Sequence, residues 1–189
     1  MSKSEIISVP DPRLRQRSSR VGVITSETLE VIARMEHATL EWEATRSSEV
    51  GVALAAVQIG ECERIVIVRL NPEDKRSREF EVFINPEITK REGEIISEAE
   101  GCLSIPDTYG LVPRHEIVRI RAIGVDGQPV RLKATGFLAR VFQHEIDHLH
   151  GKLFVDHVAP DNFYRILDDG KLEPLPPEQV DTARLLWHR

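Results

Sequence analysis

One predicted helix carries two histidines on its buried face, and this arrangement restricts the fold more than any other part of the sequence. Phe137, Val141, His144 and His148 follow the i, i+4, i+7, i+11 spacing of a single helical face. The two imidazoles therefore point with the apolar side chains, toward the interior. Burying two neighbouring histidines is unfavourable unless hydrogen bonds or a metal ion satisfy their ring nitrogens. The chain must therefore fold so that other groups reach this helix face.

The same segment, His144 to His148, reads H-E-I-D-H and matches the H-E-x-x-H pattern of many zinc hydrolases. In those enzymes the glutamate, here Glu145, takes a proton from the attacking water. The alternative is a helix that carries two histidines by chance, but the inward direction of both side chains favours a metal site. Two imidazoles do not complete such a site, so a further ligand must come from elsewhere.

The continuation of the helix does not supply that ligand. In one group of zinc hydrolases a third histidine stands where this chain has Phe154, and a phenyl ring cannot bind a metal. His150 is expected to face the opposite side of the helix, and His157 could reach the site only by a tight turn. Cys102 follows Gly101 in an upstream EGCLSIP segment. It is either a small buried hydrophobe or the missing ligand, and the incomplete site favours the ligand.

The composition is that of a globular domain and excludes several classes of protein. The 189 residues are 41% hydrophobic and 30% charged, with a net charge of −6, which differs from the basic balance typical of nucleic-acid-binding proteins. No apolar run is long enough to span a bilayer, and the N-terminal stretch lacks the apolar core of a secretory signal. Two cysteines make a poor disulfide framework. We therefore expect a cytoplasmic protein without a DNA or membrane partner.

The N-terminal part of the chain is predicted to contain one amphipathic helix. Thr25 or Ser26 can cap this helix, which is expected to run to about Arg46. The spacing of its apolar residues places Met35 and Trp42 on the buried face. We interpret both side chains as part of the core rather than as a surface for ligand stacking.

The middle of the chain is predicted to be a succession of strands. Four runs rich in β-branched or alternating apolar residues are 64–70, 80–84, 93–97 and 116–125. A charged loop joins the first two runs, and Asn85-Pro86 is expected to end the second. Asp126-Gly127 predicts a hairpin into a strand at 130–133, and Thr135 is a candidate cap for the histidine-bearing helix.

The order of these elements predicts an α+β fold. Antiparallel β-sheets are expected to pack around the central helix that bears H-E-x-x-H, with an N-terminal helix and a C-terminal extension. Residues 1–158 are expected to form the catalytic domain. Residues 159–189 are expected to form a tail with a short helix and then a Pro-rich extended segment.

Three segments, GVALAAVQ, EGCLS and QHEIDHLHG, resemble in order and spacing the signature motifs of the peptide deformylases. The N-terminal PDPRLR and the later GKLFVD agree with this family, so that the resemblance extends from Ile6 to Asp156. It implies an enzyme that removes the N-formyl group from the formylmethionine of newly made polypeptides and releases formate. The alternatives are a related metal-dependent amidase or peptidase and a deformylase-like binding protein without activity. The intact H-E-x-x-H sequence disfavours the last, because a non-catalytic protein has no physical need of it.

The resemblance also implies a ligand set of Cys102, His144 and His148 around one divalent metal ion. Fe²⁺ is the usual ion of the family and is often replaced by Zn²⁺, Ni²⁺ or Co²⁺, because imidazole and thiolate ligands suit several of these ions. Glu145 is the implied acid and base of the reaction. The side chain of Gln58 and the backbone N–H after the metal-binding cysteine, that of Leu103, are the implied donors to the oxyanion.

The implied substrate-binding residues lie in the first two motifs and are Gly51, Val52, Ala53, Glu100 and Gly101. Ala53 replaces the second glycine of the family's G-x-G-L-A-A pattern, and its Cβ matters if that position needs a positive φ. Tyr109 replaces an arginine found in some members, and Arg140 lies near a methionine pocket that is often apolar. The implied partners are an N-formylmethionyl peptide and, transiently, the ribosome, although the charge of the tail does not favour binding of RNA.

Overall fold

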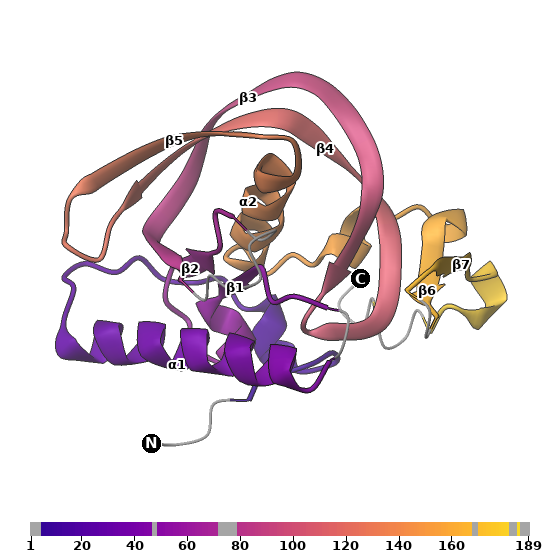
Figure 1. Cartoon of the computed structure of the whole chain (residues 1–189), viewed down its shortest axis with the longest axis horizontal. Coiled ribbons are helices and arrows are strands. Elements are labelled where there is room, and N and C mark those ends of the chain that lie inside the picture. Colours follow the sequence, from indigo (N-terminus) through magenta and orange to yellow (C-terminus); the bar gives the residue numbers. More distant parts are fainter. Residues whose placement is uncertain (1–4, 47–48, 72–78, 168–169, 182–184, 186–189) are drawn as a thin grey trace.

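The computed structural model describes residues 5–46, 49–71, 79–167, 170–181 and 185, and these residues form an α+β fold (Figure 1). The α-helices of this part of the chain are α1 (Ser26–Ala44) and α2 (Gly136–His148). The strands are β1 (Ala53–Ala55), β2 (Ile65–Val68), β3 (Glu81–Cys102), β4 (Ile105–Ile123), β5 (Pro129–Thr135), β6 (Phe163–Ile166) and β7 (Leu172–Pro174).

The strands pair antiparallel in the order β1-β2-β3-β4-β6-β7, and β5 pairs with β4 beside this path. Strands β3 and β4, of 22 and 19 residues, form the longest pair. Figure 1 shows this pair arching over α2, while α1 lies below the sheet. The prediction of an α+β fold with antiparallel sheet is confirmed, and α2 lies in the hollow of the curved strands.

Helix α1 begins as the sequence predicts, but one of its side chains has a different environment. The Oγ1 of Thr25 accepts a hydrogen bond from the N–H of Thr28 at 3.4 Å, and the Oγ1 of Thr28 accepts one from the N–H of Thr25 at 3.3 Å. Met35 is fully buried, as expected. Trp42 is not a core residue: it is half-buried and lines the main cavity, with the Arg46 guanidinium 4.0 Å from the centre of its ring.

The prediction that Asn85-Pro86 ends a strand was wrong, because β3 continues through it for a further 16 residues to Cys102. The pairing of β3 with β4 shifts its register between Ile84 and Glu87, and Asn85 has a φ of 52°. The Asn85 side chain compensates by accepting from the N–H of Val21 at 2.9 Å and donating to its C=O at 2.8 Å. A bulge accommodates proline because its missing N–H is not needed there. The two predicted strands on either side are therefore one.

The hairpin before α2 follows the sequence prediction. Asp126-Gly127 forms the turn, with Gly127 at a φ of 78°, and β5 begins at Pro129. Thr135 occupies the N-cap position of α2, although its side chain makes no capping hydrogen bond. The helix ends before Gly151, whose φ is 71° and which has no room for a Cβ atom against the carbonyl of Arg15.

The C-terminal residues join the sheet, whereas the sequence predicts a short helix followed by an extended segment. Strand β6 pairs with 108–110 of β4, and β7 pairs with β6. In the described part of the tail, single 3-10 turns lie at Pro160–Asn162 and Pro177–Gln179, and Leu185 is helical, with its N–H donating to the C=O of Asp181 at 2.9 Å. Leu185 is buried against a cluster that includes Phe154 and Phe163. Most of the predicted charged loop between the first two strands lies outside the described residues.

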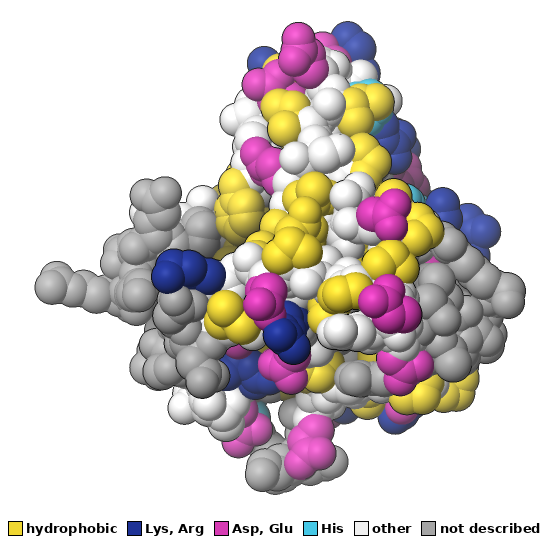
Figure 2. Space-filling view, turned by 90° about the vertical axis from the view of Figure 1, so that its right-hand side faces the viewer, with side chains coloured by type: hydrophobic (Ala, Val, Ile, Leu, Met, Phe, Trp, Pro, Cys, Tyr) yellow, Lys and Arg dark blue, Asp and Glu magenta, His cyan; other side chains and the backbone are white. Residues whose placement is uncertain are grey.

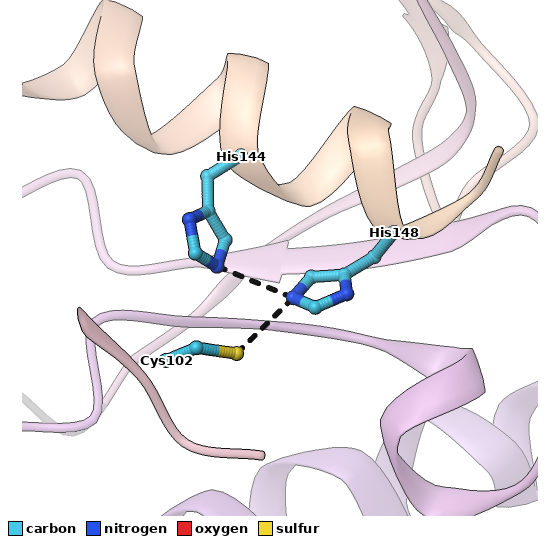
Figure 3. Close-up of side chains that lie close together, drawn as sticks. All are labelled: Cys102, His144 and His148. Carbon is cyan, nitrogen blue, oxygen red and sulfur yellow. Dashed lines mark hydrogen bonds between the residues drawn. The ribbon is translucent and has the colours of Figure 1, made fainter. Parts of the chain in front are cut away.

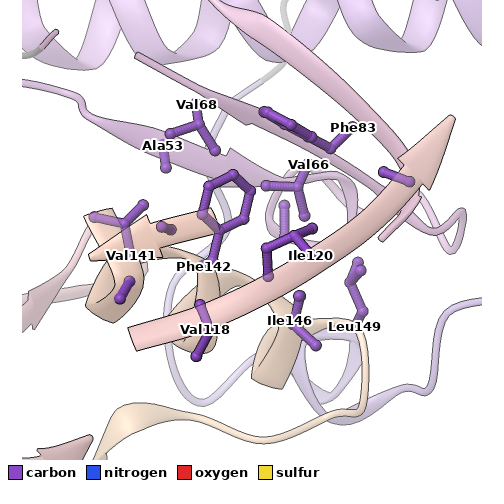
Figure 4. Packing of buried hydrophobic residues seen from close by; sticks show 14 of the residues in the cluster. Ala53, Val66, Val68, Phe83, Val118, Ile120, Val141, Phe142, Ile146 and Leu149 are labelled. Atoms are coloured by element: carbon purple, nitrogen blue, oxygen red, sulfur yellow. The ribbon is translucent and has the colours of Figure 1, made fainter. Parts of the chain in front are cut away.

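The largest hydrophobic cluster packs α2 against the sheet and so holds the histidine-bearing helix in place. The ring of Phe142 lies edge-on to that of Phe83, with centroids 4.8 Å apart. Figure 4 shows the two rings among side chains of β1, β2, β4 and α2; its labelled residues are Ala53, Val66, Val68, Phe83, Val118, Ile120, Val141, Phe142, Ile146 and Leu149. The inward apolar face predicted for this helix is therefore confirmed at Val141, although Phe137 is 56% exposed.

The surface on the β3–β4 side is chemically mixed. Figure 2 shows hydrophobic side chains scattered down the centre of this face, with acidic and basic side chains among them and no continuous basic stripe. No helix in the described part of the chain is long and apolar enough to cross a membrane.

Candidate metal centre

Cys102, His144 and His148 bring three potential metal ligands together, with their ligand atoms within 4.8 Å of one another. The Sγ of Cys102 lies 3.3 Å from the Nε2 of His148, which is 3.2 Å from the Nε2 of His144. Figure 3 shows the two rings projecting from α2 toward the thiol. The histidines lie one turn apart on the helix, and the cysteine is the last residue of β3. The structure therefore brings together the three residues that the sequence predicts as ligands.

A buried carboxylate orients the first histidine. Glu100 accepts a hydrogen bond from the Nδ1 of His144 at 3.0 Å, which directs the Nε2 of this ring at the cluster. Arg114 donates to both Glu100 oxygens, at 3.0 and 3.1 Å. Burial alone would raise the pKa of Glu100, but His144 and Arg114 lower it to about 2. The carboxylate is therefore charged at neutral pH.

The second histidine is held neutral. His148 is completely buried, and burial followed by the charge of His144 lowers its pKa well below the usual value. A neutral imidazole can offer a ring-nitrogen lone pair to a metal ion. On the other side of His144, the Phe154 ring stacks with a centroid separation of 6.1 Å. Phe154, which the sequence excludes as a ligand, therefore packs against a predicted ligand.

Glu145 lies next to the cluster and is buried, with 5% of its surface exposed. Its Oε2 is buried and has no hydrogen-bond partner among the described residues. Burial, with a smaller contribution from Glu100, raises the pKa of Glu145 to about 7, against the opposing charges of His144 and Arg114. A carboxyl group with this pKa is suited to both accept and donate a proton near neutral pH.

Gln58 and Leu103 line the same cavity as Glu145. The Oε1 of Gln58 accepts a hydrogen bond from the N–H of Ala55 at 2.8 Å, which fixes the orientation of the amide. Its Nε2 donates to the Oγ of Ser104 at 3.2 Å and lies 3.6 Å from the Sγ of Cys102. Leu103 stands in the turn between β3 and β4, directly after the cysteine. Both residues therefore lie beside the three potential ligands.

The cavity in front of the cluster has a volume of about 410 Å³ and is lined by residues of α1, β1, β3, β4 and α2. Of the predicted substrate-binding residues, Val52, Ala53, Glu100 and Gly101 line it. Gly51 does not: it packs against α1, where a Cβ atom would lie 2.4 Å from the Thr39 methyl group.

Ala53 lies in the regular strand β1, opposite Val68 of β2, and is not among the residues with positive φ. An alanine therefore meets no backbone strain where the resembling motif has glycine.

The guanidinium group of Arg140 is held by hydrogen bonds to three residues of the protein. It donates to Glu100 at 2.8 Å and to the backbone carbonyls of Val112 and Ile96, both at 2.8 Å. It also contacts Glu98, at 3.1 Å. Its charge is therefore compensated within the protein, although the side chain reaches the cavity lining.

The two remaining histidines near α2 do not belong to the cluster. His150 is exposed, as predicted. The Nε2 of His157 lies 2.9 Å from the Oδ2 of Asp147, and Arg114 also hydrogen-bonds to that oxygen. His157 thus reaches back toward α2 but pairs with a carboxylate.

The sequence interpretation missed several residues of the site. Ser104, which binds the Gln58 amide, lies within the EGCLS motif and could have been found there. Arg114 had no local signal, because it meets Glu100 only through the pairing of β3 with β4.

Tyr109, which replaces an arginine found in some members of the resembling family, donates to the Oε2 of Glu49 at 3.1 Å at the edge of the cavity. Burial raises the pKa of Tyr109 to about 12.

A family model, a curated relative and solved structures all relate this chain to the same family of proteins. Residues 3–163 match the family described as polypeptide deformylase. A peptide deformylase from Thermomicrobium roseum is 41% identical over 97% of both chains. A crystal structure of a peptide deformylase from Synechococcus elongatus in complex with actinonin has a TM-score of 0.75 and 37% identity over 84% of this chain and 83% of that one. One from Legionella pneumophila has a TM-score of 0.73 and 36% identity over 84% and 88%.

Proposed function

Since the chain belongs to the polypeptide deformylase family and removes the N-formyl group from newly made polypeptides, we propose that Cys102, His144 and His148 hold the metal ion of this reaction. The observation that carries the proposal is the convergence of one thiol and two imidazoles beside the buried Glu145. The family relationship decides against the other metal-dependent amidases and against a binding protein without activity.

The donor set fits a catalytic metal ion. Three protein ligands leave a position open for water or substrate, and a thiolate with two neutral imidazoles suits Fe²⁺, Zn²⁺, Ni²⁺ and Co²⁺. We propose Fe²⁺ as the native ion, following the family resemblance. When bound, such an ion polarises the formyl carbonyl group and lowers the pKa of a water molecule.

Glu145 is proposed to move the protons of the reaction. As a carboxylate it accepts a proton from the water that attacks the formyl carbon, and it then donates this proton to the leaving amine. Its pKa of about 7 supports both steps, because neither the charged nor the neutral form is strongly favoured at neutral pH. The absence of a partner on its Oε2, among the described residues, leaves that oxygen available for the water.

Gln58 and Leu103 are proposed to bind the oxyanion that develops on the formyl oxygen. The Gln58 amide is held by Ala55 through its Oε1, so that Nε2 remains on the side of the cluster without further reorganisation. The backbone N–H of Leu103 would be the second donor. Removing one such donor typically costs on the order of 100- to 1000-fold in rate.

The substrate is proposed to bind along β1. This strand is the first in the order of the described sheet and pairs only with β2, so a peptide in extended conformation can align with its other edge. Val52 and Ala53 would contact the peptide from this side, with Glu100 and Gly101 on the opposite wall. Gly51 would act indirectly, by allowing the segment to pack closely on α1.

The domain limits, the compartment and the partners are proposed from the sequence. We propose a catalytic domain of residues 1–158 with a tail of residues 159–189, and a cytoplasmic enzyme that meets its substrate during transient association with the ribosome. No DNA or membrane partner is proposed.

The decisive experiment is release of formate from a formyl-Met peptide by protein purified without oxygen or reloaded with Ni²⁺. We expect formate in proportion to bound metal, and no cleavage of the peptide bond after methionine. Metal bound at one equivalent without formate release would refute the proposed catalytic roles of this metal site and of Glu145.

A further inference from the structure

A second cleft, of about 470 Å³, lies on the other side of α2 from the metal ligands. Its lining includes Ile146 and His150, which lie two residues after His144 and His148 and therefore face roughly the opposite direction. The segment before α1, Arg64 directly before β2, and the strand β3 form the remaining walls. The side chains that give the cleft its donors and its positive charge are Arg17, Ser18, Arg20, Arg64, Arg91 and His150.

The charge of the cleft is opposite to that of the whole chain. Among the described residues four arginines line it, and Glu87 is the one carboxylate. Glu87 is already shared by Arg20 and by Arg121, which lies 2.8 Å from its Oε2. The side chains of Arg17 and Arg91 have no hydrogen-bond or ion-pair partner in the described part of the chain. In a protein with a net charge of −6, this local excess of positive charge is not balanced by the protein itself.

Two buried polar side chains give the cleft a fixed floor. Ser18 is 6% exposed, and its buried hydroxyl has no hydrogen-bond partner among the described residues. Arg64 is 7% exposed, and its Nη2 donates to the carbonyl of Pro86 at 3.2 Å. A buried hydroxyl without a partner and a buried guanidinium are both unfavourable unless a ligand engages them.

The backbone around these side chains is tied to its neighbours. The N–H of Ser18 donates to the carbonyl of Leu149 at 3.0 Å, and the N–H of Arg64 donates to the carbonyl of Ser19 at 2.8 Å. The N–H of Ser19 donates to the carbonyl of Cys62 at 2.7 Å. The backbone that carries Ser18 and Arg64 is thus held in place before a ligand binds.

Positive charge surrounds the buried Arg64. Burial lowers the pKa of Arg64, and the charges of Arg20 and Arg17 lower it further against the opposing effect of Glu87. His150 adds a ring nitrogen to the lining of the cleft as a further hydrogen-bonding group.

We propose that this cleft binds a small anion carrying one or two phosphate groups, either free or as the terminal phosphates of a nucleotide. Each guanidinium group can donate two parallel hydrogen bonds to two oxygens of one phosphate group. The Ser18 hydroxyl adds an uncharged donor from the floor of the cleft. A small ligand is favoured over RNA because the positive charge is confined to one cleft, whereas binding along a nucleic-acid backbone needs an extended basic surface.

The test is calorimetric titration of the metal-loaded enzyme with inorganic pyrophosphate and, in a second arm, with ADP. A double variant, Arg17→Gln with Arg91→Gln, removes two cations that have no protein partner to lose. We expect it to weaken pyrophosphate binding by about tenfold or more, since the loss of one charge-assisted hydrogen bond is typically worth about that factor. Deformylation of a formyl-Met peptide should be unchanged, because neither arginine lines the catalytic cavity.

A matched control is Arg165→Gln, which removes one positive charge from β6, outside the cleft. It should leave pyrophosphate binding within about twofold of the unmodified enzyme, as expected for an exposed charge. Equal affinities for pyrophosphate and ADP would identify the phosphates as the recognised group, and tighter ADP binding would identify a nucleotide. Absence of binding at millimolar concentration, equal binding by the double variant, or binding only to an RNA oligonucleotide would overturn the proposal.

Discussion

Replacing Arg140 by methionine is expected to destabilise the protein by about 3 kcal/mol, although Arg140 lies outside the proposed chemistry. The substitution removes the donor that Glu100, Val112 and Ile96 share, with three distances of 2.8 Å. Hydrogen bonds to a charged group are worth about 1.5–3 kcal/mol each. Burial of the methionine side chain restores about 1.5–3 kcal/mol of the free energy of unfolding, and partial relaxation of the surrounding residues restores a further part. The contact with Glu98 is excluded from this sum, because that carboxylate is 59% exposed.

The measurement is urea-induced unfolding of metal-free protein, so that metal affinity does not enter the free energy. A loss of about 3 kcal/mol is a large fraction of the roughly 5–15 kcal/mol typical of a native protein. The control is Arg119→Met, which removes an exposed arginine paired with Glu92 and should cost at most about 1 kcal/mol. If the two variants are equally stable, or Arg140→Met loses less than about 1 kcal/mol, the buried charge network does not stabilise the fold as argued.

Four further predictions address the site and the core. Glu145→Gln should retain one bound metal ion but reduce turnover by at least about 100-fold, because the proton acceptor is lost; turnover near that of the unmodified enzyme would refute its role. Cys102→Ala should lose most bound metal in elemental analysis, whereas full occupancy would point to another ligand such as His157. Gln58→Ala should lower kcat by about 100- to 1000-fold with metal retained, and a loss below about threefold would exclude it as an oxyanion donor. Phe142→Ala should lower the free energy of unfolding by about 3–5 kcal/mol, because it removes a fully buried ring from the α2 core; a loss below about 1 kcal/mol would contradict that packing.

Local features of the sequence were sufficient to predict much of the architecture. The capping residues of α1, the burial of Met35 and the turn at Asp126-Gly127 depend on neighbours within one or two turns, and the structure confirms them, whereas Trp42 lines the cavity. The spacing of His144 and His148 likewise determined that both would lie on one side of α2. These predictions succeed because the interactions behind them are made within short segments.

Other features depended on contacts between distant segments and could not be seen in any local pattern. Asn85-Pro86 has the composition of a strand end, but pairing with β4 and the hydrogen bonds to Val21 keep β3 continuous. The tail has weak periodicity of its own, and it forms β6 because an edge of β4 is available.

The proposed site divides in the same way. The residue types in H-E-x-x-H and EGCLS specified which groups could bind a metal, and the incomplete helix motif indicated that Cys102 was needed. Only the tertiary structure decided the environment of those groups. Arg114 reaches Glu100 across the β3–β4 pair, Arg140 reaches it from α2, and Glu145 is buried at the cavity wall. Whether a side chain can bind a metal ion depends on its own chemical groups, which the sequence specifies. Charge state and orientation arise from desolvation and from partners that folding brings together.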